Sequence, residues 1–260
     1  MTAADLFGLP LSLAADEPAV LARVDAAFAG EATFVTFVNP HAWTLKDRNA
    51  DYAGLLAGMD LVLADGIAVA KAAGWTTGAS VPRLSFDATS LYLPVLGRLE
   101  AKGGGLFVVG AKPGVAEGAV ARMRRTFPLI DYKGVLDGYQ PPEAVIEAIL
   151  AARPQMVLCG MGAPHQERFL ARLREAGFSG IAFTCGGFLD QLALTERYYP
   201  AWVDRLEARW LYRLLREPGR LWRRYLVEYR PFLAKALRAR LRGATAPLTR
   251  PLALPGRRGA

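Results

Sequence analysis

The residues best suited to chemistry in this sequence directly follow short apolar segments. Asp65 comes after Leu61–Leu63, and Asn39 comes after Thr33–Val38. An aspartate at the carboxyl end of a strand is placed to take a proton from an acceptor hydroxyl. It could equally cap the helix expected over Ile67–Ala73 through that helix's backbone N–H groups. Position alone does not decide between these two roles.

Three further polar side chains are candidates for substrate contacts. Arg83 could hold a diphosphate through its planar guanidinium, or merely pair with Asp87. Asn39 could hydrogen-bond a sugar, or only fix the turn before Pro40. Gln166 begins a predicted helix and could read a uracil or sugar edge. On the residues alone, ordinary surface polarity is the favoured explanation of Gln166.

Three glycine-rich turns indicate a phosphorylated ligand. Glycines let backbone N–H groups approach a phosphate, and a helix N-terminus favours an anion. One such turn is most often a plain strand-to-helix connection, but three in one sheet favour a nucleotide. None matches GxxxxGK[ST] or the full GxGxxG, which disfavours an ATPase or an ordinary dehydrogenase. The candidate residues are Gly110, Lys112 and Gly114, then Gly160 and Gly162, then Gly186 and Gly187.

These residues need a scaffold that brings strand ends together, and the apolar pattern predicts one. Strands alternating with helices predict an α/β fold, with a Rossmann-like, largely parallel sheet and helices on both faces. Ligands of such sheets bind outside the carboxyl ends of the strands. The expected strands are Thr33–Val38, Asp60–Leu63, Leu106–Val109, Met156–Leu158 and Ile181–Thr184. The expected helices are Asp87–Lys102, Pro113–Phe127, Pro142–Arg153 and His165–Ala176.

Charge divides the chain near residue 200. Residues 1–200 hold 17 Lys/Arg against 20 Asp/Glu, whereas residues 201–260 hold 15 against 4. The sequence therefore predicts a catalytic α/β domain over 1–200 and an arginine-rich helical appendage over 201–242. The remainder, 243–260, is rich in Pro, Gly and Arg and is predicted to be disordered.

The appendage has an amphipathic pattern in two helical stretches, Ala201–Arg216 and Arg220–Arg242. A basic face beside an aromatic and aliphatic face is typical of a helix lying on an anionic membrane surface. Nucleic-acid binding is the competing interpretation, but a helix that tracks phosphates needs no broad apolar face. Packing against the domain accounts for part of the pattern. The arginines recur mostly every three or four residues, at Arg205, Arg209, Arg213, Arg216, Arg220, Arg223 and Arg224.

Composition bounds the class of protein. The chain is 52% hydrophobic and 22% charged, as expected of a globular enzyme. No apolar run approaches the roughly 18 to 20 residues that span a bilayer. The apolar patch at Leu6–Leu13 has no basic residue before it, so we expect a cytoplasmic location. Two cysteines without a CxxC motif and two histidines predict reduced thiols and no metal site.

Taken together, these residues resemble the WecG/TagA/CpsF family of bacterial glycosyltransferases, from about Thr33 to Tyr225. The stretch Gly110–Glu117 is similar to the family's GxKPGVAE, and Gly160–Glu167 to its GxGxPxQE. Gly186, Gly187 and Asp190 resemble GGxxD. The segment from Trp210 to Arg224 resembles the family's WLYRL…EP…RR tail.

The resemblance implies an inverting, metal-independent transferase without a cofactor. It would move a sugar from a UDP donor to a polyprenyl-diphosphate-linked sugar at the inner membrane face, for exopolysaccharide or cell-envelope glycan synthesis. The family's proposed base maps onto Asp65, although Ala64 replaces the usual proline. Arg83 and Arg213 would stabilise the leaving diphosphate, and Gln166 matches the glutamine of the QE pair.

Departures from the family pattern cluster where the sugars would lie. Phe37 stands in place of a threonine, His165 in place of a lysine, and RLSFD in place of RVxGxD around Asp87. A hexose donor and an N-acetylhexosamine donor both stay open, as does self-association. The competing class is a non-catalytic adaptor that binds membrane or nucleic acid on a degenerate enzyme fold. The retained Asp65 and intact glycine turns argue against it.

Overall fold

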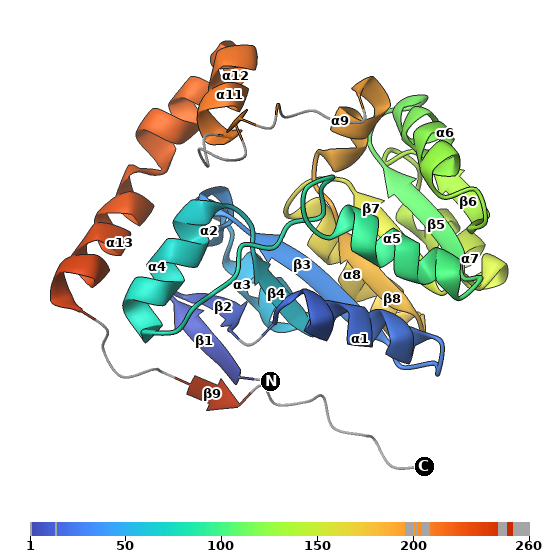
Figure 1. Cartoon of the computed structure of the whole chain (residues 1–260), viewed down its shortest axis with the longest axis horizontal. Coiled ribbons are helices and arrows are strands. Elements are labelled where there is room, and N and C mark those ends of the chain that lie inside the picture. Colours follow the sequence, from blue (N-terminus) through green and yellow to red (C-terminus); the bar gives the residue numbers. More distant parts are fainter. Residues whose placement is uncertain are drawn as a thin grey trace.

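The computed structural model describes residues 2–13, 15–195, 200, 202–203, 209–243 and 249–251, with only the backbone of residues 2, 3, 220 and 249–251. Its centre is a six-stranded sheet in the order β4-β3-β8-β7-β5-β6, in which every neighbouring pair is parallel (Figure 1). The strands are β3 (Thr33–Val38), β4 (Leu61–Ala64), β5 (Gly105–Gly110), β6 (Asp131–Leu136), β7 (Met156–Gly160) and β8 (Ile181–Thr184). The predicted α/β fold with a parallel sheet is confirmed.

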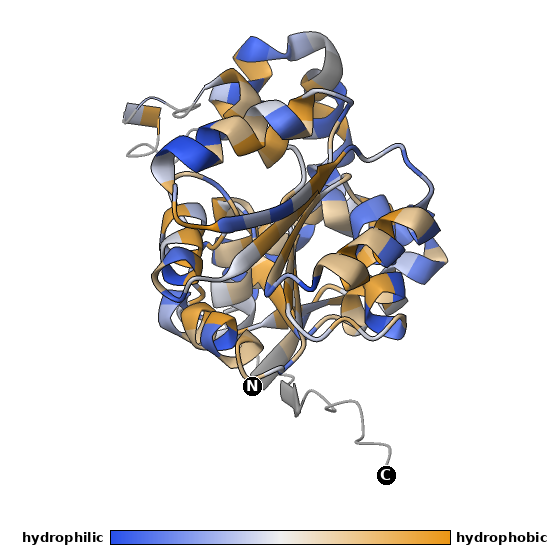
Figure 2. Cartoon of the chain, turned by 90° about the vertical axis from the view of Figure 1, so that its right-hand side faces the viewer, coloured by the Kyte–Doolittle hydropathy of each residue, from blue (hydrophilic) through white to orange (hydrophobic). Residues whose placement is uncertain are grey.

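Helices cover both faces of this sheet. The helices that flank it are α1 (Glu17–Ala27), α2 (Pro40–Arg48), α3 (Ala50–Ala57), α4 (Ile67–Thr77), α5 (Tyr92–Ala101), α6 (Val115–Thr126), α7 (Pro142–Ala152), α8 (His165–Glu175) and α9 (Phe188–Leu194). Side chains from α1, α5, α6 and α9 share one core cluster, and those from α2, α3, α4, α7 and α8 share the other. In Figure 2 the apolar strands lie between the two helical layers.

Alternation along each strand feeds the two cores. In β3, Phe34 and Val38 belong to one cluster and Val35 to the other. Successive side chains of a strand point to opposite faces, so a strand covered on both sides must be apolar throughout. All the strands but β6 are almost wholly buried along their length. This is the reason that continuous apolar runs, without a polar alternation, predict the strands correctly.

An antiparallel hairpin, β1 (Thr2–Leu6) and β2 (Leu9–Ser12), adds its own apolar residues below β4. Leu6, Leu9 and Leu11 are buried in the cluster that contains α2 and α4. The short strand β9 (Thr249–Pro251) pairs with β1, within the stretch for which the sequence predicts disorder. Residues 244–248 and 252–260 of that stretch lie outside the described part of the chain.

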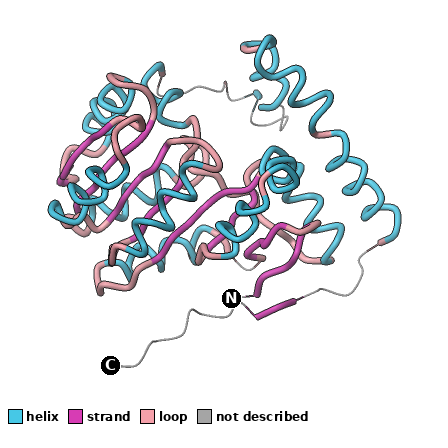
Figure 3. The backbone as a smooth tube through the Cα atoms, turned by 180° about the vertical axis from the view of Figure 1, so that it is seen from behind, coloured by secondary structure: helices cyan, strands magenta, loops and turns pink. Residues whose placement is uncertain are grey.

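The appendage forms an arm along one side of the domain, as the view from behind also shows (Figure 3). It contains α11 (Arg209–Arg216), α12 (Pro218–Arg223), a π-helical turn η1 (Arg224–Glu228) and α13 (Arg230–Arg242). Phe232 and Ala236 of α13 are buried in the same cluster as α4, with the Phe232 ring against Phe7 and Trp43 at centroid distances of 5.9 and 6.2 Å. The arm is therefore docked on the domain by an aromatic cluster that spans distant parts of the sequence.

Several boundaries differ from the expectations. The edge strand β6 and the hairpin were not predicted, and α5 begins at Tyr92 because residues 87–91 form turns. The break expected at Glu217-Pro218-Gly219 is only a bend, since Pro218 starts α12 at a position that tolerates proline. Of the first predicted tail helix, residues 201 and 204–208 lie outside the described residues. Among the helices that the structure describes, none is both long and apolar enough to cross a bilayer.

Candidate active site

The candidate residues gather at one edge of the sheet because all six strands are parallel. Asn39, Asp65, Ala111, Met161 and Cys185 are the first residues after β3, β4, β5, β7 and β8, and so lie at the carboxyl ends of these strands. Neighbouring strands are about 4.8 Å apart. Asn39 and Asp65, on adjacent strands, are therefore neighbours, whereas the loop after β5 lies four strands from Asp65.

Asp65 is oriented by Asn39. The Asn39 Nδ2 atom donates to Asp65 Oδ2 at 3.2 Å, while Asn39 Oδ1 caps α2 by accepting from His41 and Ala42 backbone N–H groups at 3.0 and 3.3 Å. Asn39 thus fixes the turn and holds the carboxylate as well. The helix-capping alternative for Asp65 is wrong, because Gly66 occupies the cap position of α4 and no side chain bonds there.

The environment of Asp65 favours a base rather than a fixed anion. Burial raises the pKa of its carboxyl, and the negative charge of Asp87 adds to the rise. The hydrogen bond from Asn39 and the positive charges of Arg83 and Arg213 act in the opposite direction. A raised pKa makes a carboxylate a stronger proton acceptor, provided that it remains ionised at the working pH.

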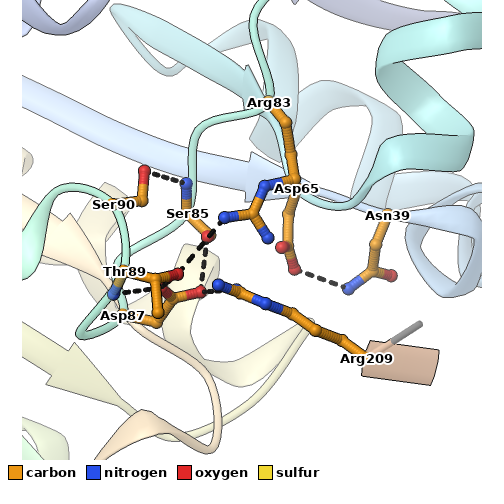
Figure 4. Close-up of polar contacts among 8 residues, drawn as sticks. All are labelled: Asn39, Asp65, Arg83, Ser85, Asp87, Thr89, Ser90 and Arg209. Carbon is orange, nitrogen blue, oxygen red and sulfur yellow. Dashed lines mark hydrogen bonds and ion pairs between the residues drawn. The ribbon is translucent and has the colours of Figure 1, made fainter. Parts of the chain in front are cut away.

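The loop after α4 forms a second polar cluster beside Asp65 (Figure 4). It runs along the end of β4, where Leu84 N–H donates to Ala64 O at 3.0 Å. Asp87 accepts from Ser85 Oγ at 2.6 Å and from the Thr89 backbone and hydroxyl at 2.9 and 2.7 Å. The Arg83 guanidinium donates to Thr89 Oγ1 at 3.4 Å and extends between Asp65 and Asp87.

The partner of Asp87 is an arginine of the appendage. Arg209 in α11 donates to Asp87 Oδ2 at 2.6 Å, and the two side chains are only 15% and 17% exposed. Burial alone would raise the pKa of Asp87, but Arg209, Ser85 and Thr89 outweigh it and hold that pKa below its usual value. The Arg83–Asp87 pairing that the sequence allows is replaced by this contact. The spacing of the tail arginines was the available signal, but it does not single out Arg209.

Other appendage residues also lie close to Asp65. Arg213 is near enough to lower the pKa of Asp65, and Asp65 contributes to the raised pKa of Tyr229, whose main cause is burial. Thr44 Oγ1 of α2 donates to Glu228 O of the π-helical turn at 3.2 Å. The arm therefore covers the Asp65 side of the edge.

His41 is a functional candidate that the sequence reasoning passed over. It is partly buried in the first turn of α2, next to Asn39. Burial and the nearby Arg224 and Arg48 lower its pKa to about 4, against the opposing charge of Glu228. At neutral pH the imidazole is uncharged, so one ring nitrogen can donate a hydrogen bond and the other can accept one.

The glycines at the far end of the edge have two different roles. A Cβ on Gly110, whose φ is +136°, would lie 2.4 Å from Gly160 O, so this glycine permits close contact between the ends of β5 and β7. Gly114, Gly162 and Gly186 also have positive φ, but the space around their Cα atoms is open. Lys112 and Gly114 are exposed. The open turns can admit a ligand, whereas Gly110 serves packing.

Gln166 is not a surface residue. It is 5% exposed, and its Oε1 atom accepts the Gly186 N–H at 3.1 Å while its Nε2 atom donates to Glu167 Oε1 at 3.0 Å. The expectation of surface polarity in this first helical turn is wrong. Within the residues that the structure describes, no group of three or more His, Cys, Asp and Glu side chains is arranged to hold a metal ion.

Comparison with known proteins agrees with this geometry. The model of the family described as "Glycosyl transferase WecG/TagA/CpsF family" matches residues 4–246. The chain belongs to the WecG/TagA/CpsF family of glycosyltransferases. The resemblance found in the sequence is confirmed, and the family match includes the arm with α11 to α13.

Two curated members of the WecG/TagA/CpsF family illustrate its range. The chain is 31% identical over 194 residues to the N-acetylglucosaminyldiphosphoundecaprenol N-acetyl-beta-D-mannosaminyltransferase of Bacillus subtilis (strain 168), covering 74% of each chain. It is 27% identical over 206 residues to the UDP-Gal:alpha-D-GlcNAc-diphosphoundecaprenol beta-1,4-galactosyltransferase of Shigella boydii, covering 77% of this chain and 84% of that one. These relatives transfer different sugars, as their names state.

Proposed function

We propose that this protein transfers a hexose or N-acetylhexosamine from a UDP donor to a polyprenyl-diphosphate-linked sugar, with inversion and without a metal ion. Both relatives are named for an N-acetylglucosamine acceptor on diphosphoundecaprenol, and one is named for a UDP-linked donor. The shared acceptor supports the acceptor class proposed here. Because the transferred sugars of the relatives differ, the donor sugar is left as either class.

The observation that carries the proposal is the Asn39–Asp65 pair at the carboxyl edge, beneath the arm. With Asn39 holding one oxygen, the Asp65 carboxylate can remove the proton from an acceptor hydroxyl as that oxygen attacks the anomeric carbon. Attack from the side opposite UDP inverts the anomeric centre. A bond forms between the acceptor oxygen and the anomeric carbon, the bond from the anomeric carbon to the diphosphate oxygen breaks, and the proton passes to Asp65.

Negative charge then develops on the leaving diphosphate and requires fixed positive partners. Arg83 and Arg213 both lie near enough to Asp65 to lower its pKa. The open glycine turns before α6 and α8 offer backbone N–H groups at helix N-termini, where an anion is favoured. Because the turn before α6 lies four strands from Asp65, we assign the diphosphate to these arginines, and the glycine turns, with Lys112 and Gly114, to the rest of the nucleotide.

The arm also supports a peripheral location at the inner face of the membrane. Large apolar side chains are exposed along it: Trp210, Leu211, Leu215, Trp222, Leu226, Val227, Leu233, Leu237 and Leu241. Their neighbours include many of the 15 Lys/Arg of residues 201–260, which oppose only 4 Asp/Glu. On a membrane-binding surface, apolar side chains enter the lipid interface and neighbouring cations contact anionic lipid headgroups. The arm carries both kinds of side chain.

The transfer reaction is tested by offering a panel of UDP-sugars with a short polyprenyl-diphosphate N-acetylglucosamine and reading products by mass spectrometry. We expect one β-linked disaccharide product, and loss of at least 100-fold in kcat for Asp65→Asn, since a positioned base contributes about 10²–10⁴-fold. Asp51→Asn, an exposed aspartate of α3, is the matched control and should leave kcat unchanged. Near-normal turnover by Asp65→Asn would refute the assignment of the base, and no uptake of UDP or UDP-sugar in calorimetry would favour the adaptor class.

The membrane surface is tested by flotation with anionic liposomes. Replacing Leu226, Leu233 and Leu237 by serine should abolish flotation, because these side chains are 47–56% exposed and make no buried core. Leu129→Ser is the control, because Leu129 is 76% exposed but lies outside the arm, and this variant should float like the parent protein. Equal flotation of the triple variant and the parent would refute the membrane surface without touching the transfer reaction.

A further inference from the structure

A buried chain of polar groups runs beneath the active-site edge. Thr36 Oγ1 in β3 donates to Glu167 Oε1 at 2.9 Å, and Gln166 Nε2 donates to the same oxygen at 3.0 Å. Gln166 Oε1 then accepts the Gly186 N–H at 3.1 Å. Thr36 and Glu167 are completely excluded from solvent. The core of the sheet is thereby connected to a glycine turn at the site.

Glu167 dictates the direction of every hydrogen bond in this chain. Because Glu167 Oε1 can only accept, the Thr36 hydroxyl donates its one hydrogen to that oxygen. Thr36 Oγ1 must then accept from Thr184 Oγ1, which lies 2.9 Å away. Gln166 must likewise turn its NH₂ group toward Glu167. Its carbonyl oxygen is then left facing Gly186. The orientation is the same whether Oε2 carries a proton or not, since both donors meet Oε1.

Stability gives no reason for a carboxyl group at this place. Burial raises the pKa of Glu167, against the hydrogen bonds from Gln166, Thr36 and its own backbone. Glu167 Oε2 and the hydroxyl of the fully buried Tyr52 have no hydrogen-bond partner among the described residues. An apolar side chain of similar size often fills such a position at no loss of stability.

We propose that Glu167 is a positioning residue for the nucleotide-sugar site. It holds the Gln166 amide in one orientation, and through that amide it fixes the open turn at Gly186 and Gly187 against the donor. The remaining hydrogen and lone pair of the Gln166 amide are left for the substrate. This inference rests on the proposed function for its ligand, a UDP-sugar, but not for its geometry.

A double-mutant cycle distinguishes this role from a merely structural one. Glu167→Met removes the acceptor at constant size, and we expect kcat/KM for the UDP-sugar to fall about tenfold through a higher KM. Glu167→Gln keeps an acceptor at the Oε1 position and should stay within about threefold of the parent. In a Gln166→Ala background, Glu167→Met should cost nothing more. Equal losses with and without Gln166 would overturn the proposal.

A measurement without substrate keeps the proposal independent of the reaction. Amide hydrogen exchange at Gly186 should speed up about tenfold in Glu167→Met, because Gln166 no longer holds its N–H. The neighbouring Cys185 N–H is the internal control, since it bonds to Cys159 O at 2.8 Å and should exchange as before. Unchanged exchange at Gly186 would refute the positioning role. A parent protein that turns over no UDP-sugar would refute the proposed function but leave this result standing.

If Glu167→Met does not fold, the threonines provide milder variants. Thr36 and Thr184 are both fully buried on adjacent strands, but only Thr36 donates to Glu167. Thr36→Val should loosen Gln166 and speed exchange at Gly186 more than Thr184→Val does. Equal effects of Thr36→Val and Thr184→Val would mean that the Glu167 carboxyl group does not act through these hydrogen bonds, and would overturn the proposal.

Discussion

Arg209→Met tests whether the arm holds the loop around Asp87 in place. The substitution keeps the apolar stem of the side chain and removes the charge that meets Asp87 Oδ2 at 2.6 Å. A hydrogen bond between charged groups is worth about 1.5–3 kcal/mol. The two side chains are 15% and 17% exposed, and Asp87 keeps the Ser85 and Thr89 hydrogen bonds, so no bare buried charge is left.

We therefore expect a loss of about 2 kcal/mol in the docking of α11, or about 30-fold in its equilibrium. Transfer activity should fall by up to that factor, measured as kcat/KM with a soluble acceptor so that membrane attachment does not enter. Added salt should weaken the attraction between Arg209 and Asp87 less than that of an exposed ion pair, because both groups are largely buried. The activity of the parent enzyme should therefore depend only weakly on salt concentration.

Arg216→Met is the matched control for this experiment. Arg216 lies in the same helix, is exposed and donates to the Tyr212 hydroxyl of that helix at 2.9 Å. Its loss should leave kcat/KM within about twofold of the parent. A similar loss in both variants, or no loss in Arg209→Met, would refute the view that the Asp87 contact holds the arm over the site.

Three further predictions concern the base, the arm and the glycine turns. The acid limb of the pH profile of kcat/KM should have its midpoint above the ordinary aspartate pKa of about 3.9, because the Asp65 pKa is raised and only the ionised form accepts a proton. Arg83→Gln removes a charge that lowers this pKa and should move the midpoint to still higher pH. An unchanged midpoint in Arg83→Gln would contradict this. Phe232→Ala should weaken the packing of α13 on the domain by about 3–5 kcal/mol, so that limited proteolysis cleaves the arm before the sheet unfolds. Cleavage of the arm and of the sheet domain at the same rate would contradict this prediction. Gly110→Ala should lower the free energy of unfolding by several times the roughly 1 kcal/mol expected for Gly114→Ala, as measured by urea denaturation, because only the first meets backbone within 3 Å.

Much of the sheet was predictable because burial on both faces leaves a strong local signal. Thr33–Val38 and Ile181–Thr184 were predicted with their observed bounds. Strand β6 was missed because its sequence DYKGVL belongs to an edge, where Asp131 and Lys133 are exposed and Gly134 makes room for the Phe107 ring. Edge strands carry charges that hide them from a search for apolar runs.

The site was predictable to the extent that it depends on strand order. Asn39 and Asp65 follow consecutive strands, and consecutive strands are usually neighbours, so their contact follows from the pattern. The contact of Arg209 with Asp87 joins residues 122 positions apart, and no local pattern encodes it. Glu167 lies in the first turn of a helix, where acidic side chains are common, and only its tertiary surroundings bury it.

The docking of α13 also has a consequence for the growing polypeptide. Phe7 and Trp43, which receive Phe232, are made early, and Phe232 follows Trp43 by roughly 190 residues. At about 5–20 residues per second, ribosomes need roughly 10–40 s to reach it. Throughout that interval Phe7 and Trp43 lack the Phe232 ring that packs on them in the complete fold. The packing of Phe232 on Phe7 and Trp43 is thus a late event of folding during synthesis.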